Sequence, residues 1–127
     1  MAYDNVTMGI KTHRDLIVWQ KAMTLVESIY RITKSFPREE LYGLTSQLRR
    51  AVVSVPANLA EGHARAGTKD YANFVSIAKG SLMEAETLVD VALRLGYIAS
   101  DAARLAGEAM NEIERMLAAL HSRLTRQ

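Results

Sequence analysis

The sequence predicts an all-α protein, an up-down-up-down four-helix bundle that associates into an oligomer. Apolar residues recur every three or four positions through four long segments, which is the spacing of one helix face. The links between these segments are short, and short links favour antiparallel neighbouring helices. No segment alternates apolar and polar residues as a half-buried strand does.

The first helix is expected over residues 14–35. Its predicted apolar face consists of Val18, Trp19, Ala22, Leu25, Val26, Ile29 and Tyr30. We expect Trp19 and Tyr30 to be largely buried against the neighbouring helices. Phe36-Pro37 should end this helix, because the residue before a proline avoids helical geometry.

The second helix, expected from residue 41 to residues 62–65, carries a polar stripe between two apolar flanks. The polar residues, spaced three or four apart, are Gln47, Arg50, Ser54, Asn58, Glu61 and Arg65. The large apolar residues on one flank are Leu44, Leu48, Val52, Val55 and Leu59, which suit a bundle core. The small residues on the other flank, Val53, Ala57 and Ala60, let a second backbone come close, and we predict that they form a subunit interface.

Pro56 lies inside this second segment. A proline within a helix removes one N–H donor and crowds the carbonyl group four residues earlier, so it should kink the helix. The alternative is two shorter helices that separate at Ser54–Val55. We favour one kinked helix, because the polar stripe keeps its phase through the proline.

The third and fourth helices are expected over residues 69–95 and 100–124. Thr68 and Ser100 are the predicted N-caps, and Gly96 should end the third helix. The predicted apolar face of the third helix is Tyr71, Phe74, Ile77, Ala78, Ser81, Leu82, Ala85, Leu88, Val89 and Ala92. That of the fourth is Leu105, Ala109, Met110, Ile113, Met116, Leu117, Leu120 and Leu124. Gly80-Ser81 is expected to permit a close helix contact.

Several short sequence motifs together resemble those of a known family. They are LIVWQ (16–20), YGLTSQLRRAVVSVPANLAEG (42–62), AKGSLMEAE (78–86) and LGYI (95–98). In order and spacing they resemble the small 23S rRNA intervening-sequence proteins over about residues 14–120. The resemblance implies a four-helix bundle that forms a ring-like homopentamer. It also implies a relative, the accessory protein of diversity-generating retroelements, which works with a reverse transcriptase and nucleic acid. It implies no established activity.

Composition indicates one soluble domain. The 127 residues are 49% hydrophobic and 24% charged, which is ordinary for a globular protein. Residues 1–12 lack periodicity and are expected to form a flexible arm before a bundle domain of residues 13–127. The lack of cysteine fits a reducing compartment, and neither a signal peptide nor a membrane span is recognisable, so we expect a cytoplasmic protein with no membrane partner.

The sequence gives no indication of an enzyme. The three histidines, His13, His63 and His121, form no Glu-x-x-His or His-x-x-x-His pair, so we expect no metal site and no cofactor. No nucleophile and base are recognisable together, so we expect no catalytic residue.

The polar stripe allows two interpretations. Gln47, Arg50, Asn58 and Glu61 either form a structural hydrogen-bonded network or line a pore or groove that binds a ligand; we favour the structural one. Glu61 and Glu84 either make a buried acidic site or each pair with an arginine such as Arg50, within or between subunits. We favour the arginine pairing.

Basic residues near the ends of the second helix are the candidate nucleic-acid contacts: Arg38, Arg49, Arg65 and Lys69. They are either a solvated surface or phosphate ligands. A net charge of +2, from 16 basic and 14 acidic residues mixed along the chain, predicts weak, sequence-independent binding at most. The leading hypothesis is a non-enzymatic homo-oligomeric scaffold or accessory protein, pentameric, with a protein or nucleic-acid partner. The alternative is a nucleic-acid-binding accessory module that acts through basic patches on the assembled ring.

Overall fold

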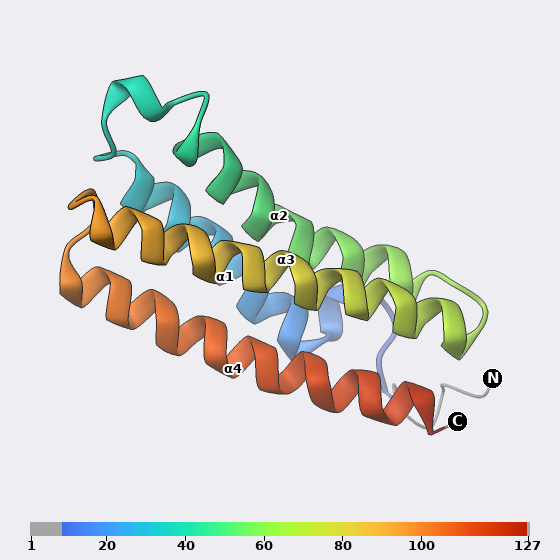
Figure 1. Ribbon diagram of the computed structural model, residues 1–127. Helices are drawn as coiled ribbons and strands as arrows, with labels where there is room; N and C mark the ends of the chain where they lie inside the picture. The colour runs from blue at the N-terminus through green and yellow to red at the C-terminus, as the bar shows by residue number, and fades with distance from the viewer. Residues whose placement is uncertain (1–8, 127) are drawn as a thin grey trace.

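The computed structural model describes residues 9–126, in which four α-helices account for most of the chain (Figure 1). The helices are α1 (Ile17–Thr33), α2 (Leu44–His63), α3 (Thr68–Arg94) and α4 (Ser100–Thr125). Helix α1 packs against α2 and α4, and α3 packs against the same two helices. No strand occurs within residues 9–126, which confirms the all-α prediction. No helix in this range is long and apolar enough to cross a membrane.

A short 3-10 helix, His13–Asp15, precedes α1. Thr12 caps it through a reciprocal capping box, in which its side chain accepts from the N–H of Arg14 and the Asp15 carboxylate accepts from the N–H of Thr12. A further hydrogen bond from the N–H of Lys11 reaches the same carboxylate, and these backbone donors hold the pKa of Asp15 below its ordinary value. The first part of the expected arm, residues 1–8, lies outside the described residues.

Helix α2 is continuous across Pro56, so the alternative of two separate helices is wrong. Pro56 is buried, and the helix runs seven residues beyond it to His63. The start of α2 differs from the sequence prediction by three residues. A 3-10 helix, Arg38–Glu40, occupies the link after Pro37, and α2 begins only after Gly43.

Helix α3 ends as expected at a left-handed glycine. Gly96 has a φ of +77°, and the N–H of Tyr97 donates to the carbonyl oxygen of Ala92 over 2.9 Å. The two predicted N-caps are wrong. Thr68 and Ser100 are the first helical residues, and the cap positions before them are Gly67 and Ala99, with no side-chain hydrogen bond.

Helices α2 and α3 come close together at Gly62. A Cβ atom on Gly62 would lie 2.8 Å from Cβ of Phe74 and 2.9 Å from Cδ1 of Tyr71, both on α3. Gly80, where the sequence suggested a close contact, has open space around it. Its neighbour Ser81 does meet α2, through a hydrogen bond of 2.8 Å between its hydroxyl group and that of Ser54. The absence of a side chain is therefore needed at Gly62 rather than at Gly80.

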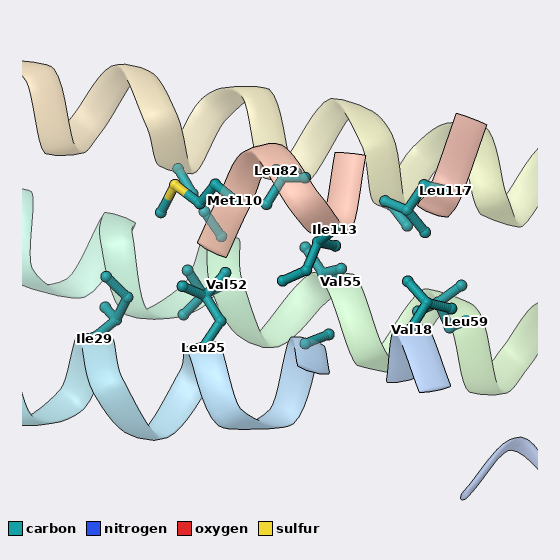
Figure 2. Packing of buried hydrophobic residues seen from close by; sticks show 14 of the residues in the cluster. Val18, Leu25, Ile29, Val52, Val55, Leu59, Leu82, Met110, Ile113 and Leu117 are labelled. Carbon is teal, nitrogen blue, oxygen red and sulfur yellow. The ribbon is translucent and has the colours of Figure 1, made fainter. Parts of the chain in front are cut away.

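Side chains from all four helices fill the centre of the bundle (Figure 2). Those that are fully enclosed and drawn there include Ile29, Val52, Val55, Leu59, Leu82, Met110 and Leu117. Three predicted core residues differ, since Tyr30, Ile77 and Leu105 are exposed by 41%, 51% and 56%, whereas Trp19 is partly buried and packs against the core. Each of these exposed residues lies at the edge of its helix's apolar face, where the sequence pattern cannot say how far the neighbouring helix extends.

Candidate functional site

The polar stripe of α2 is only partly hydrogen-bonded. Of the four residues in the predicted network, Gln47, Arg50 and Glu61 are exposed and Asn58 is half-buried. Asn58 Nδ2 donates to the carbonyl oxygen of Ser54 over 2.8 Å and to its Oγ over 2.9 Å. Since Ser54 also bonds Ser81, a chain of three side chains joins α2 to α3. Within residues 9–126, Gln47, Arg50 and Glu61 take no part in it.

A groove of about 330 Å³ lies between α2 and α3 above this chain. Its lining is formed by Gln47, Arg50, Ala51, Ser54, Ser81 and Glu84. Arg50 and Glu84 line the same groove without an ion pair between them in the described part of the chain. Glu61 lies outside this lining, and both Glu61 and Glu84 are exposed, so they form no buried acidic pair. The groove is polar and carries one charge of each sign.

The predicted interface residues lie on the outer surface of α2. Val53 is 40% exposed, Ala57 is exposed and Ala60 is half-buried. On the neighbouring α1, Met23 and Tyr30 are also exposed, by 38% and 41%. Both helices therefore expose apolar side chains that the bundle core does not use.

The four predicted basic contacts divide between the two ends of α2. Arg49 lies in its second turn and Arg65 just beyond its end, which places their backbones about 24 Å apart at 1.5 Å per residue. Arg38 lines the same pocket as Arg49, and Lys69 is the second residue of α3, four positions after Arg65 in the sequence. One continuous basic patch is therefore absent among these four residues, which form two separate pairs.

Arg49 in α2 and Arg65 in the loop after it each lie over an aromatic ring. The guanidinium carbon of Arg49 is 4.6 Å from the ring centroid of Tyr30, and that of Arg65 is 4.8 Å from the centroid of Phe74. Arg49 Nε also donates to the hydroxyl oxygen of Thr33 over 2.9 Å. Stacking and hydrogen bonding restrict the Arg49 side chain, which keeps its terminal N–H groups in one place.

The histidines make ring contacts. His13 lies edge-on to Trp19, with centroids 5.2 Å apart, and His63 lies edge-on to Tyr71 at 5.8 Å. Partial burial, and then the nearby charge of His13, lower the pKa of His63 below its ordinary value. Among residues 9–126, no three His, Asp or Glu side chains are grouped so that they could hold a metal ion.

Sequence reasoning missed a second polar feature, the buried threonines at the start of α2 and the end of α1. Thr33 and Thr45 are each only 3% exposed, and both line a pocket with Arg38 and Arg49. The signal was present: Thr45 lies three residues before Leu48 and seven before Val52, on the core-facing side of the helix. What the sequence could not show is that Thr33 comes from another helix to the same pocket.

Comparison with known protein families gives a match over most of the chain. A family model described as 23S rRNA-intervening sequence protein matches residues 14–119, which is most of the chain. A search of curated proteins found no match.

Proposed function

The chain belongs to the 23S rRNA-intervening sequence protein family, and from that premise we propose that it is a non-enzymatic, homo-oligomeric scaffold or accessory protein. Its subunit is an up-down-up-down bundle that acts in the cytoplasm. Five subunits form a ring in this proposal, as the resemblance noted above implies. Its role is to present a repeated surface to a protein or nucleic-acid partner.

The outer surface of the α1–α2 pair is the single observation that carries this proposal. Val53 and Ala57 are exposed, and so are Met23 and Tyr30 on the adjacent helix. Burial of exposed apolar area against a second copy is favourable by roughly 25 cal/mol per Å². The small side chain of Ala57 lets a helix from another subunit approach closely. A symmetric assembly then covers this surface on every subunit.

The charges in the α2–α3 groove support assembly as well. Arg50 and Glu84 are exposed and unpaired with each other within the subunit. In an oligomer, each can pair with the opposite charge of a neighbouring copy. Such pairs orient subunits more than they strengthen association.

Multi-angle light scattering tests the oligomer directly. The expected mass is a multiple of the 14.1 kDa subunit at micromolar concentration. Ala57→Arg should release monomers with unchanged far-UV helix content, because a charged side chain then occupies the proposed contact. Ala118→Arg, at an exposed position of α4, is the matched control and should leave the mass unchanged. A wild-type protein that is monomeric under these conditions contradicts the proposal.

Nucleic-acid binding is the second candidate function. The observation that favours it is the pocket shared by Arg38 and Arg49, whose lining also contains Lys34 and no acidic residue. Repetition around a ring would multiply these charges, so binding should fall steeply as salt increases. A titration of labelled RNA and DNA at several salt concentrations tests this candidate. Binding that does not change with salt speaks against an electrostatic origin.

A further inference from the structure

A pocket of about 340 Å³ lies where the end of α1, the Arg38–Glu40 helix and the start of α2 meet. Its lining consists of Thr33, Lys34, Phe36, Pro37, Arg38, Leu41, Thr45 and Arg49. We propose that this pocket is a binding site for a phosphoryl group. The proposal is independent of the oligomer and deepens the second candidate function, because a phosphoryl group can belong either to a nucleic acid or to a small molecule.

The charge of the lining favours an anion. All three charged lining residues are basic, namely Lys34, Arg38 and Arg49. Glu39 and Glu40 follow Arg38 in the 3-10 helix, but neither lines the pocket. Glu40 is engaged elsewhere: its Oε1 accepts from the N–H of Leu44 and its Oε2 from the hydroxyl of Tyr97, each over 3.1 Å. A group with one or two negative charges therefore meets three cations inside the pocket and no carboxylate.

The side chain of Arg49 is fixed in a conformation that suits such a ligand. Its Nε donates to Thr33 Oγ1 over 2.9 Å, and Thr33 Oγ1 in turn donates to the carbonyl oxygen of Ile29 over 2.7 Å. The ring of Tyr30 supports the guanidinium group from one side. No residue in the range 9–126 accepts a hydrogen bond from the terminal nitrogens of Arg49. Two parallel N–H groups in a restricted position match the oxygen spacing of a phosphoryl group, and less side-chain entropy is lost on binding.

Thr45 provides a second observation, independent of charge. Only 3% of its surface is exposed, and it lines the pocket. Its hydroxyl group makes no hydrogen bond within residues 9–126, and its oxygen is not among the enclosed polar atoms that lack a partner, so it is open to the pocket. A phosphoryl oxygen in the pocket would accept a hydrogen bond from this hydroxyl.

The apolar wall defines the size of the ligand. Phe36 is buried, and together with Pro37 and Leu41 it bounds the pocket beside the basic side chains. Displacement of water by an apolar wall strengthens the charge interactions on the opposite side. The site therefore suits a compact tetrahedral anion, or the terminal phosphate of a larger molecule that extends into solvent past the exposed Arg38.

The first experiment titrates the purified full chain with inorganic phosphate by calorimetry at low salt, with sodium chloride at equal ionic strength as reference. Arg38→Gln and Thr45→Val should each weaken phosphate binding by about tenfold or more, since a hydrogen bond to a charged group is lost. Thr45→Ser, which keeps the hydroxyl, should retain binding. Lys69→Gln removes one exposed charge at the other end of α2 and is the matched control.

Two results would overturn the proposal. One is phosphate binding no stronger than the chloride effect in the wild-type protein. The other is an equal loss in Lys69→Gln and Arg38→Gln, which would indicate only a general charge effect. If Thr45→Val fails to fold, the comparison of Arg38→Gln with Lys69→Gln still decides the outcome, because both residues are exposed.

A competition assay distinguishes the two sources of the phosphoryl group. The probes are one single-stranded oligonucleotide with a 5′-phosphate and the same strand with a 5′-hydroxyl. Displacement of phosphate by the phosphorylated strand alone identifies a nucleic-acid terminus as the ligand. Phosphate binding that neither strand disturbs supports a small phosphorylated molecule, and it separates the pocket from the nucleic-acid candidate. Strong strand binding that Arg38→Gln and Thr45→Val leave unchanged supports that candidate and rejects the pocket as the site where the strand binds.

Discussion

The hydroxyl group of Tyr97 donates a hydrogen bond to the carboxylate of Glu40 over 3.1 Å. The two residues are far apart in sequence, and each lies in a link between two α-helices. The ring of Tyr97 also lies 5.9 Å from that of Phe36. The α1–α2 link and the α3–α4 link are thereby joined at the same end of the bundle, which Figure 1 shows on the left.

We expect Tyr97→Phe to lower the urea midpoint of unfolding, because it deletes this hydrogen bond and leaves the ring contact intact. The bond to Glu40 also raises the pKa of Tyr97 above its ordinary value. A double-mutant cycle with Glu40→Gln is the control. If Tyr97→Phe has the same effect in both backgrounds, the hydroxyl–carboxylate bond does not stabilise the fold.

Gly62→Ala should destabilise the protein by roughly 1–3 kcal/mol, because the new methyl group would overlap Phe74 and Tyr71. Urea denaturation followed by circular dichroism measures this loss. Gly80→Ala is the matched control, at an exposed helical site with open space. It should stabilise by about 0.5–1 kcal/mol through helix propensity. A similar effect of both substitutions would mean that α2 and α3 are not in close contact at Gly62.

Glu86→Gln should raise stability at neutral pH. Partial burial, then the carboxylates of Glu114 and Asp90, raise the pKa of Glu86 above its ordinary 4.5. The folded protein therefore binds the proton more tightly than the unfolded chain, and stability falls as pH rises through the interval from 4.5 to the raised pKa. The gain from Glu86→Gln should be clear at neutral pH and disappear in acid. Urea midpoints at both pH values check this, with Glu84→Gln as the control on another helix face.

For His63 we expect the opposite pH dependence of stability. Its pKa is lowered from the ordinary 6.5, so the unfolded chain binds a proton first as the pH falls. The contribution of His63 to stability is fully present above pH 6.5, and it declines as the pH decreases from 6.5 toward the lowered pKa. Thermal unfolding on either side of this interval should show a loss of midpoint temperature that is smaller in His63→Gln. A loss of equal size in the variant assigns the pH dependence to other groups.

Much of the fold could be predicted from the sequence, because the 3.6-residue period sets both the helices and their inner faces. The four helices begin and end within three residues of the predicted positions, and Gly96 ends α3 as expected. The wrong predictions of the helix N-caps came from residue type alone, which shows that a side chain is able to cap a helix but not whether it lies at the cap position. Thr68 and Ser100 can cap a helix, yet each lies one residue inside it.

Less of the candidate site could be predicted. Arg38 and Arg49 were recognisable as basic residues near the start of α2. Their association with Lys34 and two buried threonines depends on the axial position of α1 against α2, which no periodicity encodes. The same reason explains why Tyr30 appeared to be a core residue, whereas it supports Arg49 at the surface.

The bridge between Ser54 and Ser81 gives the molecule a practical property. The two hydroxyl oxygens are 2.8 Å apart, and the chain contains no cysteine of its own. Replacement of both serines by cysteine would therefore place two thiols within reach of disulfide formation, with no competing partner. Oxidation would fasten α2 to α3 covalently and reduction would release them. A reversible cross-link could thus be introduced in the α2–α3 groove, and partner binding could be compared in the oxidised and reduced states of one protein.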